Sequence, residues 1–445
     1  MSRNTSLLLL LTFLFAPLQA QTNDARPMLD QILKRLDALE SENRRLADEL
    51  HALRQELAGV QSTPATAPAT PLEERVDVNE KRVAEQAQTK VESSQKFPIS
   101  LNGMLVFNAF SSSGHASSLY TGYAPLLTGP DETGATVGQS IIGLQFQGPS
   151  LPGGGRVNGY ISMDFGGDWS PYNNTGSFRI REAAVSLDWT QRSLSFGQMK
   201  PLISPLQPSS LAEVAVSPLA GAGNLWYWLP QARYEERLRL NSQNGVTLQA
   251  SVIQTDESAA NVAAEYASSL ERARPGVEGR AAYWHQWDEA RKLEIGTAFH
   301  VSSTHVAGVT VPSHIASVDW SISPFTKLQW TGTFYKGQNV ASLGSLGNGF
   351  SIYPNDSVRA IHTTAGWTQL AVPITSRLNF HLFGGMEWDA HSYGIVRNFT
   401  YGSNLYYHLG PNVLIGPEVL QTRYVYFGSS HPIVNHYDLA LAYLF

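Results

Sequence analysis

From residue 97 onward, apolar and polar residues alternate with a period of two. In the segment 156–165, Val157, Ile161 and Met163 fall on one face and polar residues fall on the other. The same alternation occurs in the segments 245–252, 314–322 and 326–334. Strict alternation over such lengths predicts β-strands that each have one apolar and one polar face.

The alternation predicts 16 strands, and the connections between them decide the fold. The expected strands are 98–110, 138–149, 154–166, 178–189, 191–199, 231–240, 245–255, 276–287, 291–303, 313–322, 326–337, 357–371, 375–388, 397–409, 411–426 and 434–445. Short, turn-like links (150–153, 190–191, 242–245, 288–290, 324–325, 371–373 and 410–411) alternate with long ones (111–137, 200–230, 256–275 and 338–356) and intermediate ones (167–177, 304–312, 389–396 and 427–433).

A soluble sandwich also alternates, but tight turns on one rim, long loops on the other and an even strand count are typical of an outer-membrane barrel. A closed barrel is also the sheet that satisfies all its backbone groups in lipid. We therefore predict an all-β fold for residues 97–445, a 16-stranded antiparallel transmembrane β-barrel, preceded by an α-helical coiled coil.

The last strand, YDLALAYLF, shows how this barrel would close. Tyr437, Leu439, Leu441, Tyr443 and Phe445 share one phase and are expected to face lipid, whereas His436, Asp438, Ala440 and Ala442 would face inward. Pairing with the first strand allows the chain to end within the sheet, with aromatic residues at the membrane rim.

An apolar heptad pattern near the N-terminus predicts the coiled coil, over residues 27–60. Its seam, with alternating spacings of three and four, is Leu29, Ile32, Leu36, Leu39, Asn43, Leu46, Leu50, Leu53, Leu57 and Val60. Such a seam requires partner chains, and Asn43 would specify their register. The alternative is an amphipathic helix packed on its own domain, which favours a wider apolar stripe. Residues 61–96 are expected to be a linker and a weak helix.

Residues 1–20 read as a secretory signal peptide. Arg3 precedes a short apolar run at 7–16, and Ala20 is a plausible cleavage position. The run is too short for a membrane anchor. The absence of cysteine excludes thiolate chemistry and disulfides, and the net charge of −6 disfavours nucleic acid as a partner.

The segment SPLQPSSLAEVAVSPLAGAGNLWYWLPQARYEERL (204–238) resembles the long third loop and following strand of DcaP-like porins, which are trimeric and have an N-terminal periplasmic coiled coil. RIREAAVSLDW (179–189), LSFGQMKPLISP (194–205), the opening FPISLNGMLVF and the closing YDLALAYLF also fit that family. The resemblance implies a homotrimer of barrels in the bacterial outer membrane, with the coiled coil in the periplasm.

In that family each barrel has its own pore, narrowed by an inward third loop, and the associated solutes are small anions, dicarboxylates in particular. Phosphate-selective porins share the general plan. The terminal Tyr443 and Phe445 resemble the signal that is read by the barrel-assembly machinery.

Alternation places Arg156, Arg233, Arg237 and Arg280 in the lumen. Arg179 and Arg181 share a phase with the apolar Ala183, Val185 and Leu187, so either a bulge intervenes or the inner wall is locally apolar; inward arginines are favoured. A ring of guanidinium groups would select anions. Acidic residues are expected on the same wall: Asp164, Glu235, Glu278, Asp319, Glu418 and Asp438. The third loop contributes Glu213, Lys200 and an aromatic run, Trp226, Tyr227 and Trp228, which differs from a strongly basic anion trap.

These residues are compatible with three different functions. The first is a passive channel, either for anions or as a general porin that admits small hydrophilic solutes. The second is a barrel hydrolase, for which His300, His362, His381 and His408 are candidates without a nucleophile motif, so an enzyme is not expected. The third is a tether between the outer membrane and the cell wall. Glu387, Asp389 and His391 have metal-ligating chemistry, but a solvated loop tip is favoured, and neither a cofactor nor a metal is expected.

Overall fold

The computed structural model describes residues 99–113, 129–167, 177–257, 262–353, 355, 357–390, 392–428 and 431–445. The expected signal peptide, the coiled-coil seam from Leu29 to Leu57, the linker and His391 lie outside the described residues. Within them, no helix is long and apolar enough to span a bilayer.

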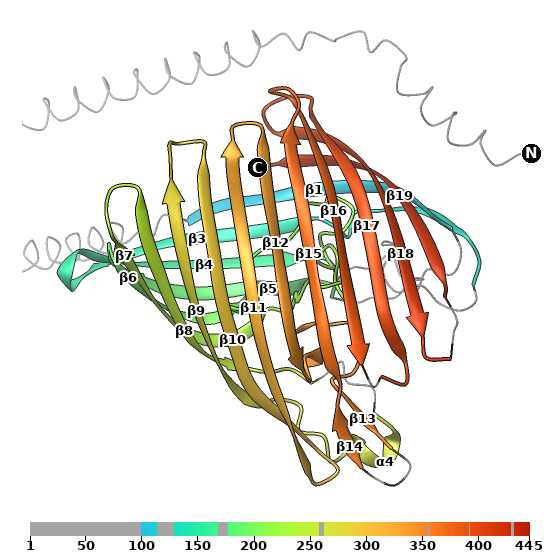
Figure 1. Ribbon diagram of the computed structural model, residues 1–445. Helices are drawn as coiled ribbons and strands as arrows, with labels where there is room; N and C mark the ends of the chain where they lie inside the picture. Colours follow the sequence, from blue (N-terminus) through green and yellow to red (C-terminus); the bar gives the residue numbers. More distant parts are fainter. Residues whose placement is uncertain are drawn as a thin grey trace, which may run out of the picture. The chain divides into compact units, whose positions relative to one another are not determined.

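The described chain is almost entirely antiparallel strand (Figure 1). The wall strands are β1 (Ile99–Ser113), β2 (Glu132–Thr136), β3 (Ile141–Leu151), β4 (Gly155–Asp164), β5 (Arg179–Asp188), β6 (Arg192–Met199), β7 (Leu229–Arg239), β8 (Asn244–Gln254), β9 (Pro275–Gln286), β10 (Lys292–Val306), β11 (Val309–Phe325), β12 (Leu328–Gln338), β15 (His362–Pro373), β16 (Leu378–Ala390), β17 (Ile395–His408), β18 (Val413–Tyr426) and β19 (Ile433–Leu444). From β3 onward, each of these wall strands pairs with the next one in this order.

The sheet closes on itself because β1 also pairs with β19, from Met104 opposite Leu444 to Ser113 opposite Asn435. β2 and β3 pair with successive parts of β1 and occupy one position in the wall. With that position counted once, the described strands form a closed antiparallel barrel of 16 strands. The predicted fold class is confirmed for the barrel.

The two faces of the wall differ as the alternation predicts. On β19, Tyr437, Leu441 and Tyr443 are exposed on the outside, whereas His436 and Asp438 are buried on the inside. Outward apolar residues suit a lipid environment, and the enclosed face carries the polar groups. The chain ends within the sheet, where Phe445 N donates to Gly103 O at 3.2 Å and Phe445 O accepts from Gly103 N at 3.0 Å.

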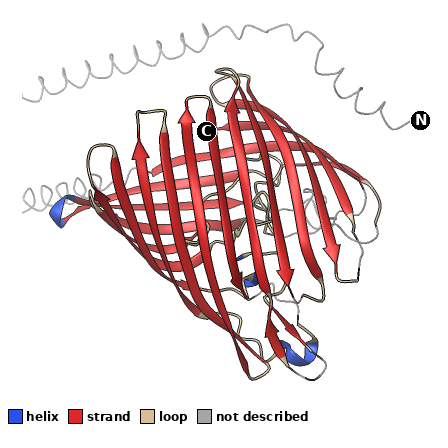
Figure 2. Cartoon of the chain, in the orientation of Figure 1, coloured by secondary structure: helices blue, strands red, loops and turns tan. Residues whose placement is uncertain are grey.

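The two rims also differ (Figure 2). Tight turns join the strands at one rim, including the short 3-10 turn Pro152–Gly154, and longer connections leave the other rim. One expected link on that second rim is wrong: the loop predicted at 304–312 is strand except for Ala307 and Gly308. Both residues have positive φ (52° and 72°), so they form a two-residue hairpin turn that extends β10 and β11 beyond their expected ends.

A small apolar cluster lies at this second rim. It joins the tip of the β10–β11 hairpin, the hairpin of β13 (Phe350–Ile352) and β14 (Val358–Ala360), and the short helix α4 (Ala264–Ala267). Its buried members are Leu270, Val306, Val311 and Phe350.

Candidate functional site

Residues 200–228, which connect β6 to β7, lie inside the barrel (Figure 2) and are named the inner loop. Side chains from many strands hold the backbone of the inner loop. Asn108 donates to Leu211 O, Asn398 to Gly221 O and Asn404 to Ser209 O, while Leu202 N donates to Glu278 and Ser209 N to Gln369. An inward third loop was expected, and these bonds, which span up to 195 residues of sequence, place it against the inner wall of β1, β9, β15 and β17.

One wall glycine, Gly385, and one glycine of the inner loop, Gly223, allow the inner loop to approach the backbone of the sheet. A Cβ at Gly385 would lie 2.0 Å from Ala222 O, and a Cβ at Gly223 would lie 2.4 Å from Gly366 O. Gly223 also has a φ of +95°, in the region that favours glycine. The loop therefore packs directly on the backbones of β15 and β16 without side chains between them.

A second inward segment, residues 339–349 between β12 and β13, was not predicted as such. Tyr227 N of the inner loop donates to Leu343 O at 3.4 Å, so this segment contacts the inner loop. Its Val340 and Leu343 enter a buried apolar cluster that includes Ile203 and Leu225. The absence of any charged residue between 337 and 355 was the signal in the sequence that this segment is not an ordinary solvated loop.

Glu387, on the inner face of β16, anchors this segment. Its carboxylate accepts from Leu346 N at 2.8 Å and from Tyr335 OH at 3.1 Å, and the residue is fully buried. Asp389, also buried, accepts from Thr363. The prediction that these two residues form a solvated loop tip is therefore wrong, because β16 extends to Ala390 and carries them along the inner wall. Among the described residues, no group of three histidine or carboxylate side chains could hold a metal ion.

The arginines of β5 lie against the inner loop. Arg179 binds Asp164 through two nitrogens, at 2.7 and 3.1 Å, and Arg181 lies 3.4 Å from the same carboxylate. Both also donate to carbonyls of the inner loop, Arg179 to Ala215 O and Arg181 to Val214 O. We name Asp164, Arg179 and Arg181 the arginine cluster.

The sequence left two alternatives for β5, a bulge or a locally apolar inner wall, and the register between β4 and β5 shows the bulge. Ser162 pairs with Glu182 and Met163 with Ile180, so Arg181 is the extra residue of a bulge. The bulge lets Arg179 and Arg181 point inward although Val185, further along, is exposed on the outside.

The aromatic run of the inner loop covers these guanidinium groups. The Arg181 guanidinium lies 4.5 Å from the centre of the Trp228 ring, and Arg179 lies 5.8 and 5.6 Å from Trp226 and Trp228. Trp226 also packs edge-on against Tyr227 at 5.0 Å. Cation–π contact and the shared carboxylate together fix both arginines.

The other predicted lumen arginines are paired separately. Arg280 is buried between Asp319 (2.6 Å) and Glu294 (2.8 Å), and Arg237 binds Glu235 at 2.7 Å. Arg233 donates to Gln231 and to Lys200 O, and Arg156 is exposed near the tight-turn rim. The structure thus brings Arg179, Arg181 and Asp164 together as one cluster, whereas Arg233, Arg237 and Arg280 each have their own partners.

Of the candidate histidines, His300 has the most ordered surroundings. Its Nδ1 is 3.0 Å from Glu278 Oε1 and its Nε2 is 2.8 Å from Ser302 Oγ. This is the bonding order of a catalytic triad. However, His300 and Glu278 are fully buried, and Glu278 also accepts from Leu202 N of the inner loop. The chain of bonds anchors the loop to β9.

Outside the membrane-spanning strands, one buried carboxyl is notable. Glu257 follows β8 and is 2% exposed, and it accepts a bond from the Thr304 hydroxyl. Burial raises the pKa of Glu257 above its ordinary value, and the neighbouring Asp256 adds to the effect.

The lumen contains a pocket of about 390 Å³ beside the inner loop. The loop lines it with residues 207–211 and with Glu213, Val214, Ser217 and Pro218, and the wall lines it with Met104, Ile141, Arg181 and Tyr406. We name this space the lumen pocket.

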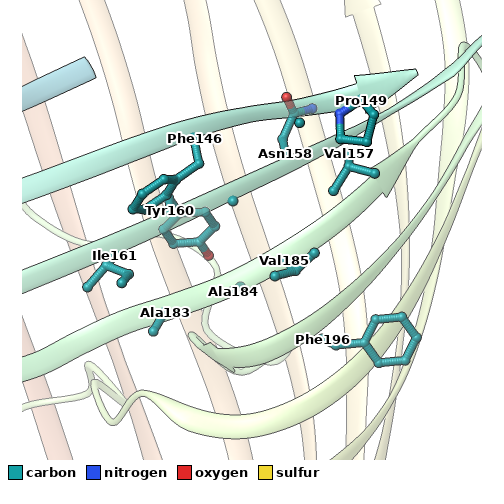
Figure 3. A pocket seen from close by; sticks show the side chains of 12 residues that line it. Phe146, Pro149, Val157, Asn158, Tyr160, Ile161, Ala183, Ala184, Val185 and Phe196 are labelled. Carbon is teal, nitrogen blue, oxygen red and sulfur yellow. The ribbon is translucent and has the colours of Figure 1, made fainter. Parts of the chain in front are cut away.

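A second hollow, of about 450 Å³, lies on the outer face of β3 to β6 (Figure 3). Phe146 of β3 and Phe196 of β6 flank it, and Val157 and Val185 lie between them. Gly159 also lines it. The register pairs Phe146 with Gly159, Gly159 with Val185 and Val185 with Phe196, so the hollow arises where glycine replaces a large outward side chain.

No protein-family model matches this chain, and no curated protein matches it. Among solved structures, the chain is similar to the outer membrane channel DcaP of Acinetobacter baumannii, with 17% identity, a TM-score of 0.63 and coverage of 78% of this chain and 97% of that chain. It is also similar to an anion-selective porin from Comamonas acidovorans, with 12% identity, a TM-score of 0.55 and coverage of 79% and 100%. At these identities the likeness concerns the fold, and the resemblance to DcaP-like porins is confirmed at that level.

Proposed function

We propose that this chain is an outer-membrane porin, a passive diffusion channel for small hydrophilic solutes that prefers anions such as dicarboxylates. The observation that carries the proposal is a closed barrel with a loop folded into its lumen and a net positive cluster held against that loop. The fold is shared with DcaP and with the anion-selective porin, both of which are channels by name.

The charge of the arginine cluster supports the anion preference. Two guanidinium groups share the single carboxylate of Asp164, which leaves one net positive charge where the wall meets the inner loop. Arg179 keeps about a quarter of its side chain exposed, so it is accessible to solutes. Guanidinium groups bind carboxylates through paired hydrogen bonds, which suits dicarboxylates.

A homotrimer is part of this proposal. The predicted coiled-coil seam precedes β1 along the chain and requires partner copies. The outer hollow on β3 to β6 lies near β1 in the order of the sheet and is apolar, so a second copy could fill it with large side chains. We also propose that each copy lies in the outer membrane and that its coiled coil lies in the periplasm, as the resemblance to DcaP-like porins implies.

A general porin without anion preference is the alternative, and the buried carboxyls of Glu213, Glu387 and Glu418 favour it. The deciding experiment is the reversal potential of the purified protein in a planar bilayer under a KCl gradient. We expect an anion preference that Arg179→Ala and Arg181→Ala reduce. A cation preference, or none, would refute anion selectivity and leave the general porin, and no conductance would refute the channel itself.

A further inference from the structure

Two arginines lie on the outer face of β17 and β18, near the rim with the longer connections. Arg397 is close to the start of β17 and Arg423 is close to the end of β18, and both are exposed. Their neighbours Asn398 and Tyr424 are buried on the inner face, so the alternation places both arginines outward. They therefore lie on the side of the wall that faces lipid and not on the side that faces the lumen.

The register brings these two arginines close together. Arg397 is opposite Val425, and Arg423 is opposite Phe399, which is two residues from Arg397 on the same strand. Diagonal positions of this kind are about 7–8 Å apart, within the reach of two long side chains. Two positive charges at this distance repel each other, so an anion that lies between them is attracted by both.

No carboxylate of the neighbouring strands supplies that anion. The aspartates and glutamates of β16 to β19 are all buried on the inner face: Glu387, Asp389, Glu418 and Asp438. Within the described chain, none of the salt bridges includes Arg397 or Arg423. Arg280 on the inner wall, by contrast, has two carboxylate partners. The outer pair is therefore available to an anion from outside the chain.

Aromatic residues place this pair at the level of the lipid head groups. Trp388 is opposite Arg397 and Phe399 is opposite Arg423, and both rings are exposed on the outside. Outward aromatic residues near the ends of barrel strands mark the boundary between the hydrocarbon and the head groups. Arginine stems lie along the apolar surface there, while the guanidinium groups reach the polar layer. The anion that meets both arginines at this level is the head group of a lipid.

We propose that Arg397 and Arg423 bind a phosphate group of an outer-leaflet lipid, which bridges their two guanidinium groups. The leaflet is the outer one because the longer connections of such barrels face the cell exterior. Guanidinium groups bind phosphate through paired hydrogen bonds, and two of them around one phosphate balance its charge. The proposal rests on the location in the outer membrane and not on the solute that the channel passes.

The test measures lipid binding to the purified, detergent-solubilised protein by native mass spectrometry. The probes are lipid A, a glycolipid with two phosphates, and the same lipid after both phosphates are removed. We expect the phosphorylated form to bind more tightly, and the double variant Arg397→Gln with Arg423→Gln to bind it more weakly, by about fivefold for each arginine replaced. Arg377→Gln is the matched control, because it removes an exposed arginine from the tight turn between β15 and β16 at the opposite rim. It should leave binding unchanged.

A second double variant, Arg397→Lys with Arg423→Lys, keeps both charges and loses the paired hydrogen bonds. Its affinity for phosphorylated lipid A should lie between those of the native protein and the glutamine variant.

Equal binding of the two lipid forms, unchanged binding in the glutamine variant, or an equal loss in Arg377→Gln would overturn the site. Displacement of lipid A by an equal concentration of inorganic phosphate would indicate a general anion site and would overturn its assignment to a lipid. Binding is counted here without any ionic current, so a failure of the lipid site and a failure of the channel function are distinguished.

Discussion

The substitution Asp164→Asn separates the charge of the arginine cluster from its shape. Asparagine retains an oxygen that can accept from Arg179 and from Gly166 N, which donates to Asp164 at 2.9 Å. The negative charge is lost, so the net charge of Arg179, Arg181 and residue 164 rises from +1 to +2. If the cluster acts on permeating ions, this variant should be more anion-selective than the native protein.

The size of the effect follows from Coulomb's law. One extra unit charge about 4 Å from a hydrated anion contributes about 1 kcal/mol in water, which corresponds to about fivefold in local anion concentration. Salt screens this term over about 10 Å at 0.1 M, so the effect should fall as the KCl concentration rises.

The assay is the permeability ratio of chloride to potassium, from reversal potentials in planar bilayers at about 0.05 and 1 M KCl, where screening differs strongly. Asp288→Asn is the matched control, because it removes the same charge from an exposed turn between β9 and β10, where Asp288 pairs with Arg291. An unchanged ratio at low salt in Asp164→Asn, or an equal rise in Asp288→Asn, would refute the reasoning that the cluster sets selectivity.

Two further predictions concern the inner loop and the outer cluster. Gly385→Ala should displace the inner loop and make the channel current noisier, because its Cβ would lie 2.0 Å from Ala222 O. Overpacking of this kind costs about 1–3 kcal/mol. The control is Gly384→Ala, on the outer face, which should leave single-channel recordings unchanged. The buried Glu257, whose pKa is raised, favours its protonated form in the fold, so stability near α4 should fall as pH rises from the ordinary glutamate pKa through the raised one. Hydrogen exchange of residues 262–274, corrected for intrinsic rates, should show this fall in the native protein and not in Glu257→Gln.

The barrel could be predicted closely from the sequence because its signal is local. The period of two, which places Tyr437 outward and Asp438 inward, depends only on the pleat of a strand. The alternation of short and long links and the aromatic C-terminus then define a closed antiparallel sheet. The β13–β14 hairpin was missed because strands of three residues are too short to show an alternating pattern. The tight turn at Ala307 was missed because the β10–β11 hairpin extends beyond the part of the wall where one face must be apolar.

The candidate site was only partly predictable. Alternation identified the inward residues of β7, β9 and β19, but it could not decide the orientation of Arg181, because one bulge residue reverses the phase of a strand. The sequence by itself determined that the chain forms strands with one apolar face, enough of them to close a barrel.

Only the tertiary structure decided which segments enter the lumen and where they bind. The inner loop and residues 339–349 are fixed by bonds such as Asn398 to Gly221 O, 177 residues apart, and by the close approach of Ala222 to Gly385. Such contacts leave no periodic trace in the sequence, because each depends on two distant positions meeting inside a barrel that must first close.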